Sequence, residues 1–157
     1  MPNLHAMPLT FMTHETWFGP EAATPRSILL CIGSNPEEYK ALRRMIDPSV
    51  WQVISANTCR NGIRRIAKGV QVVLCECNLP DGSWKDILNR IVDMEMPPQL
   101  VVISRLADAY LWSEVLNLGG FDVLAKPLVA TEVRQVLEAA ARNYLRTNRR
   151  TQTAGGA

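Results

Sequence analysis

Three polar side chains stand at the ends of three separate apolar stretches of the sequence. Glu76 ends "VVLCE", Ser104 ends "LVVIS", and Lys126 directly follows "FDVLA". A carboxylate at the end of a buried strand is costly unless it has a function or a partner. A carboxylate, a hydroxyl and a lysine that converge from three strands are a more specific signal than any one of them, and the surrounding elements must bring them together.

Short apolar stretches alternate with segments of helical period from residue 27 onward, which is typical of a β/α chain with a parallel sheet. We expect strands at 27–32, 51–56, 70–76, 99–104 and 121–125, and helices at 36–46, 58–68, 83–94, 107–118 and 131–144. The central strands are almost continuous Val, Ile and Leu, as expected when helices cover both faces of a sheet. Sites in such sheets form beyond the carboxyl ends of the strands, where all three polar side chains are expected.

The length and charge of the chain limit the classes of function that it can have. Its 157 residues, of which 47% are hydrophobic, suffice for one globular domain with a full core and leave no room for a second. The net charge of +2 is too small to indicate nucleic acid or a membrane as a partner. No apolar run is long enough to span a membrane and no secretion signal is evident, so we expect a cytoplasmic protein.

Both ends of the sequence differ in composition from the centre. Residues 1–26 hold four of the ten prolines and are predicted to be an N-terminal leader, either extended or docked as an arm through the apolar part of "FMTHETWF". Residues 146–157 are predicted to be a flexible basic tail. The arginines near this tail could contact nucleic acid, but a solvated helix end is the preferred interpretation.

The four cysteines form no CxxC pair, so we expect buried thiols and no disulfide. Cys75 and Cys77 share a strand face opposite to Glu76, and Cys31 lies on the adjacent strand. Three thiols could approach zinc, but no fourth ligand is evident, and we predict no metal site.

Three motifs resemble the receiver domain of two-component response regulators over about residues 26–145. "VVLCECNLPDG" is similar to the phosphoacceptor motif of that family, "LVVISR" to the strand that ends in the switch hydroxyl, and "GGFDVLAKPL" to the Lys-Pro motif. The resemblance implies a flavodoxin-like three-layer α/β/α sandwich with strand order 2-1-3-4-5 and a receiver-like domain at 27–145. It places Glu76 at the phosphoacceptor position, Ser104 at the switch hydroxyl and Lys126 at the lysine.

The sequence departs from the family pattern at several of these positions. The acidic pair that would bind magnesium is replaced at positions Ile32, Gly33 and Ser34, so magnesium binding is expected to be lost or weak and no cofactor is expected. Glu76 is one methylene longer than the usual aspartate, which matters where about 1 Å of misplacement can cost 100-fold. Val123 replaces the usual aromatic switch residue. Arg105 could lie across the pocket that a phosphoryl group would fill.

We therefore expect a stand-alone atypical receiver domain of bacterial phosphorelay signalling, which is no enzyme and acts as a phosphorylation-independent interaction module. Glu76 would be paired permanently with Lys126 or Arg105. The alternative is a functional receiver that accepts a phosphoryl group at Glu76 or responds to phosphodonors.

The expected partner is a signalling protein or a second copy of the chain, bound through the fourth helix, fifth strand and fifth helix. Tyr110, Trp112 and Leu116 are the interface candidates, although Trp112 could instead be buried against the leader. No membrane contact is expected, and nucleic acid is an unlikely partner.

Overall fold

The computed structural model describes residues 26–67 and 69–155, apart from the side chain of Gln152. Its main sheet has five strands in the order β2-β1-β3-β6-β7, and every neighbouring pair is parallel. These strands are β1 (Ser27–Ile32), β2 (Trp51–Ala56), β3 (Val70–Glu76), β6 (Gln99–Ser104) and β7 (Asp122–Ala125). Counted along the chain, this is the order 2-1-3-4-5 that the resemblance implies, so the fold prediction is confirmed.

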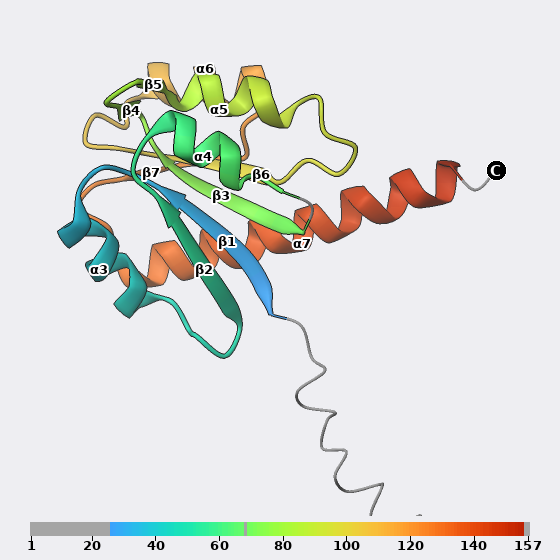
Figure 1. Ribbon diagram of the computed structural model, residues 1–157, viewed down its shortest axis with the longest axis horizontal. Coiled ribbons are helices and arrows are strands. Elements are labelled where there is room, and N and C mark those ends of the chain that lie inside the picture. The colour runs from blue at the N-terminus through green and yellow to red at the C-terminus, as the bar shows by residue number, and fades with distance from the viewer. Residues whose placement is uncertain (1–25, 68, 156–157) are drawn as a thin grey trace, which may run out of the picture.

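Helices cover both faces of the sheet and make it the middle of three layers (Figure 1). They are α3 (Pro36–Met45), α4 (Cys59–Arg65), α5 (Trp84–Ile91), α6 (Ala109–Leu118) and α7 (Ala130–Gly155). Successive strand residues point to opposite faces, so Val73 packs in the core beneath α4, α5 and α6 whereas Val72 and Leu74 pack on the side of α3 and α7. This double burial explains why the central strands are almost continuously apolar.

A short antiparallel hairpin, β4 (Asn78–Leu79) with β5 (Gly82–Ser83), lies between β3 and α5. Ser83 caps α5 in a reciprocal capping box with Asp86. The Asp81 carboxylate in the hairpin turn accepts hydrogen bonds from the backbone N–H groups of Cys59 at 2.6 Å and Arg60 at 3.0 Å. The hairpin therefore holds the start of α4 in place.

The last helix is longer than the sequence analysis predicted. Its expected end at Tyr144 is wrong, because α7 continues to Gly155 (Figure 1). Asn148 is buried one helical turn beyond Tyr144, and Thr151 and Thr153 donate hydrogen bonds to carbonyls one turn earlier. Most of the predicted flexible tail is therefore helical.

The predicted leader lies almost wholly in residues 1–25, outside the described residues. Within the part of the chain that the structure describes, no helix is both long and apolar enough to cross a membrane.

Candidate functional site

The carboxyl ends of three adjacent strands bring the predicted polar side chains to one edge of the sheet. Glu76 is the last residue of β3 and pairs in register with Ile103 of β6, whose next residue, Ser104, pairs with Ala125 of β7. Lys126 follows directly, and its backbone N–H donates to the Ser104 carbonyl at 3.0 Å. The convergence expected from the sequence is thus present in the backbone.

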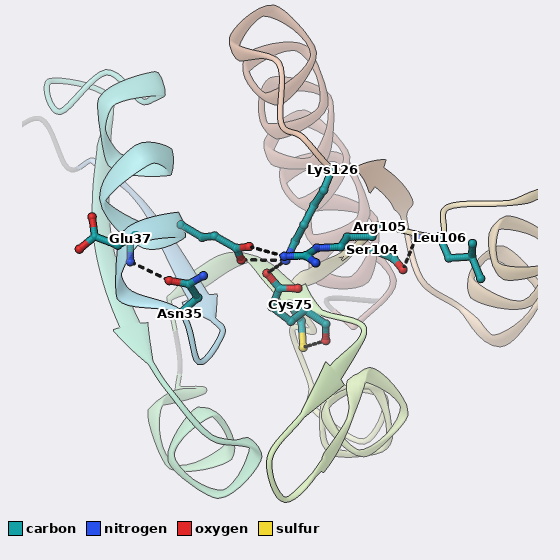
Figure 2. Close-up of polar contacts among 9 residues, drawn as sticks. Asn35, Glu37, Cys75, Ser104, Arg105, Leu106 and Lys126 are labelled. Carbon is teal, nitrogen blue, oxygen red and sulfur yellow. Dashed lines mark hydrogen bonds and ion pairs between the residues drawn. The ribbon is translucent and has the colours of Figure 1, made fainter.

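Lys126 lies between two carboxylates. Its Nζ is 2.7 Å from Glu76 Oε1 and 2.7 Å from Glu38 Oε2 (Figure 2). The Lys126 and Glu76 side chains are only 16% and 18% exposed, so both charges are largely withdrawn from water. The ion pair with Lys126, one of the two partners predicted for Glu76, is therefore present, and the amine has no need of an external anion.

Glu38 is the functional residue that sequence reasoning missed. Asn35 caps α3 by accepting a hydrogen bond from the Glu37 N–H at 2.9 Å, and Pro36 occupies the first turn. This start positions Glu38 to reach Lys126, 88 residues further along the chain. The available signal was the pair of glutamates, Glu37 and Glu38, in the first helical turn after β1.

Arg105 pairs with Glu38 and not with Glu76. Its Nη2 is 3.9 Å from Glu38 Oε1, and its side chain is 82% exposed. An exposed pair at this distance contributes little to stability. Arg105 thus borders the site from the solvent side, beside the charged cluster that Glu38, Glu76 and Lys126 form.

The pKa values in the charged cluster shift in different directions. The hydrogen bond from Lys126 lowers the pKa of Glu38. Burial raises the pKa of Glu76, and the adjacent Glu38 carboxylate adds to this effect, although Lys126 opposes it. Burial acts against the charge of Lys126, but its bonds to both glutamates outweigh burial and raise its pKa. Glu38 therefore stays ionised to a lower pH than Glu76 and is the more persistent counter-ion of Lys126. Glu76 is the carboxyl that takes up a proton first as the pH falls.

The positions of the missing acidic pair are occupied by apolar, small or exposed groups. Ile32 is buried at 2% exposure in the core, and Ser34 is exposed. A Cβ atom built on Gly33 would lie 2.9 Å from the Glu76 Cγ. The longer glutamate therefore fills the space that a side chain at position 33 would need.

Comparison with known proteins bears on the fold of the chain. No protein-family model matches the sequence. The chain is 30% identical over 117 residues to the transcriptional regulatory protein KdpE of Mycobacterium tuberculosis, with 74% of this chain covered, and it spans about half (51%) of that protein's length.

Solved structures give the clearer match. The signal receiver domain of a LuxO repressor protein from Vibrio parahaemolyticus aligns with a TM-score of 0.73 at 18% identity, covering 79% of this chain and 96% of that one. The non-phosphorylated HemR receiver domain from Leptospira biflexa aligns with a TM-score of 0.67 at 20% identity, covering 74% and 94%. The chain has the receiver-domain fold of two-component response regulators.

Two of the residues aligned with receiver motifs stay outside the charged cluster. The Ser104 hydroxyl accepts a hydrogen bond from the Leu106 N–H at 3.1 Å, and in Figure 2 it is directed toward that residue. Val123 is buried at 7% exposure in the same core cluster as Leu111 and Val115 of α6. In this chain the Ser104 hydroxyl is engaged locally, and position 123 holds a core residue.

The predicted interface residues lie on the surface of α6. Tyr110 is 75% exposed, Trp112 46% and Leu116 39%. Leu111 and Val115 of the same helix are buried, whereas Leu118 near its end is 50% exposed. The alternative burial of Trp112 against the leader concerns residues outside the described part of the chain.

All four cysteines are free thiols, and Cys31, Cys59 and Cys75 are buried. Burial raises the pKa of Cys31 to about 12, so its thiol stays protonated at neutral pH. In residues 26–67 and 69–155, no three His, Cys, Asp or Glu side chains lie close enough together to hold a metal ion. Cys31, Cys59 and Cys75 pack as small core residues.

Proposed function

We propose that this chain is an atypical receiver module of a two-component pathway, which keeps one conformation without phosphorylation and acts through contacts with proteins. The observation that carries the proposal is the position of Lys126, whose amine already has two carboxylate partners at 2.7 Å. A phosphoryl group would have to displace at least one of them.

Phosphoryl transfer depends on positioned groups that stabilise the charge of the phosphoryl oxygens, and a cation is normally among them. The Glu76 carboxylate supplies a permanent negative charge where a phosphorylated aspartate would supply a temporary one. The Ser104 hydroxyl, which would contact the phosphoryl group, bonds Leu106 N–H instead. Both features support a module whose state is fixed by its own side chains and which catalyses no reaction.

The residues present do not fit magnesium, the ion that the receiver fold implies. Magnesium requires hard oxygen ligands in near-octahedral geometry. Ile32 and Gly33 offer no side-chain oxygen, and both carboxylates of the charged cluster are bound by the Lys126 ammonium. A divalent cation at this position would also be repelled by that ammonium. We therefore propose that the module works without a cofactor.

Protein contact is assigned to the exposed apolar surface of α6. Tyr110, Trp112 and Leu116 present aromatic and aliphatic groups of the kind that anchor protein interfaces. The similarity to a transcriptional regulatory protein covers only about half of that protein's length. We therefore propose a role in a signalling pathway for this chain and do not extend it to the control of transcription. We propose a signalling protein or a second copy of the chain as the partner.

The second candidate is a functional receiver that accepts a phosphoryl group at Glu76. The observation in its favour is that Glu76 and Lys126 are in contact and border an open cavity. The two candidates differ in one covalent event, which can be measured directly.

The test is incubation of the full chain with acetyl phosphate and magnesium, followed by intact mass spectrometry. A receiver domain with a complete acidic pair serves as the positive control. We expect no added mass on this chain while the control gains one phosphoryl group. A phosphoryl adduct that disappears in Glu76→Gln would overturn the proposal and establish the second candidate.

A further inference from the structure

A large cavity opens beside the charged cluster and extends between α3 and the carboxyl ends of β1 and β2. Its volume is about 1070 Å³, at the upper end of the range for sites that bind drug-sized molecules. Small residues leave this room, namely Ser34, Ala41, Ser55 and Ala56. The space exceeds what a single phosphoryl group or metal ion would need.

The inner wall of the cavity is apolar. Met45 of α3 and Leu128 after β7 are partly exposed there, and behind them lie the packed core residues Cys31, Leu42, Leu74 and Ile103. Such a surface favours the rings or chain of an organic molecule, because apolar contact area is gained there without the loss of hydrogen bonds to water. The apolar wall thus selects for a ligand with a hydrophobic body.

The charges that border the cavity favour an anion. Glu38 and Glu76 contribute two negative charges, but Lys126 and Arg105 already pair with them. Arg64 and Arg65, at the α4 side of the cavity, are exposed and form no ion pair with any residue that the structure describes. The cavity therefore has two cationic groups available and no unpaired carboxylate to oppose an anion.

We infer that this cavity binds a soluble small organic anion, with the hydrophobic body between α3 and the sheet and the acidic group toward Arg64 and Arg65. The occupant has an aromatic or aliphatic body and one carboxylate, sulfonate or phosphate group. Binding of such a molecule does not depend on whether Glu76 can be phosphorylated, so the inference can fail or hold separately from the proposed function.

The first experiment titrates the full chain with 8-anilinonaphthalene-1-sulfonate, an aromatic anion, and with its uncharged analogue N-phenyl-1-naphthylamine. We expect saturable binding of one anion per chain. Arg64→Gln/Arg65→Gln should weaken binding of the sulfonate by about two- to tenfold, because two exposed charge contacts are lost. The same variant should leave binding of the uncharged analogue unchanged.

A matched control removes two positive charges elsewhere. Arg44 and Arg90 are exposed and do not line the cavity. Arg44→Gln/Arg90→Gln should leave sulfonate binding unchanged. Equal losses in the two double variants would show an effect of net charge alone and would overturn the assignment of the acidic group to Arg64 and Arg65.

Two measurements locate the ligand. Ala41→Trp should weaken binding of both probes by at least about tenfold, because the indole fills space that their rings need. Amide chemical-shift mapping on the unaltered chain keeps the inference testable if that variant does not fold. We expect shifts at α3 and at the ends of β1 and β2.

Three results would overturn the inference. They are the absence of saturable binding, shifts confined to Trp112 and Leu116 of α6, and nuclear Overhauser contacts between residues 1–25 and Leu42 or Met45. The last result would make the N-terminal segment of the chain the occupant of the cavity.

Discussion

At the scale of residues, the chemistry of this site is set by one ammonium between two carboxylates. Lys126 bridges Glu38 and Glu76 at 2.7 Å from each. Two carboxylates this close are tolerated because the ammonium compensates both, and the raised pKa of Glu76 reflects the burial that remains uncompensated. The cluster therefore depends on the lysine more than on either glutamate.

Lys126→Met should destabilise the fold by about 1–3 kcal/mol at neutral pH, because two neighbouring carboxylates lose their shared cation. The value is below that for a fully buried pair because solvent reaches part of the cluster. The measurement is urea unfolding, with Lys85→Met as the control. Lys85 forms an ion pair with Glu114 at 2.9 Å but is 49% exposed. An equal loss in both variants would contradict the account.

The two glutamates should respond to pH with opposite signs. The pKa of Glu38 is lowered on folding, so its contribution to stability is present above its ordinary pKa and is lost as the pH falls through the folded value. The pKa of Glu76 is raised, so its contribution is present at low pH and is lost as the pH rises through the folded value.

Glu38→Gln should therefore destabilise the protein more at about pH 7 than at about pH 3, and Glu76→Gln should show the reverse trend. Urea unfolding of both variants and the unaltered chain at the two pH values measures this difference. If the stability of the two variants changed with pH in the same way, the conclusion that Glu38 stays ionised to a lower pH than Glu76 would be contradicted.

Gly33 should be intolerant of a side chain only while Glu76 is present. Gly33→Ala places its Cβ against the Glu76 Cγ and should cost about 1 kcal/mol or more in unfolding free energy. In a Glu76→Ala background the same change should cost little, which a double-mutant cycle measures. Additive losses would show that the close approach of Gly33 to Glu76 is of no consequence.

At the scale of elements, α4 is fitted closely to β1. A Cβ atom on Gly62 would lie 2.6 Å from the Ile32 Cδ1, although alanine is the better helix former. Gly62→Ala should destabilise the protein by about 1–3 kcal/mol because the helix must move away from the sheet. Gly155→Ala, at a position with no neighbour within 4 Å, is the control in thermal or urea unfolding. A neutral Gly62→Ala would contradict this packing.

The strands could be predicted from the sequence, whereas several helix ends and one site residue could not. The runs 27–32, 51–56, 70–76 and 99–104 match β1, β2, β3 and β6. Burial on both faces makes the central runs almost continuously apolar, so they stand out from the helical segments. The end of α7 depends on the tertiary burial of Asn148, which has no signature in the local pattern. Glu38 was missed for a similar reason, since its reach to Lys126 follows from how α3 is placed.

At the scale of the whole molecule, the charged cluster and the exposed α6 surface lie on separate elements linked by β6 and β7. Because Val123 beneath α6 is buried and Ser104 bonds Leu106, the described structure offers no aromatic switch between the two regions. A module of this kind would present the same surface to its partner at all times. Recognition would then be controlled by the amounts of the two proteins or by a ligand.

If the partner is a second copy of the chain, Trp112→Ala should weaken self-association by about tenfold, as is usual for a buried aromatic anchor. Sedimentation equilibrium of the full chain measures this. Val92→Ala is the matched control, since Val92 is also exposed, at 55%, but lies just beyond α5. A chain that is monomeric at all concentrations, or equal effects of the two changes, would contradict a homodimer through α6.

The central claim, that the site holds its own charge and needs no phosphoryl group, is tested most directly by amide-resolved NMR during titration with magnesium and then beryllofluoride, which mimics a phosphoryl group. The account predicts no saturable shifts at Glu76, Ser104 or Lys126 at millimolar magnesium, and none on addition of beryllofluoride. Selective, saturable shifts at these three residues, spreading to α6, would contradict it and would show a working phosphoryl-binding site.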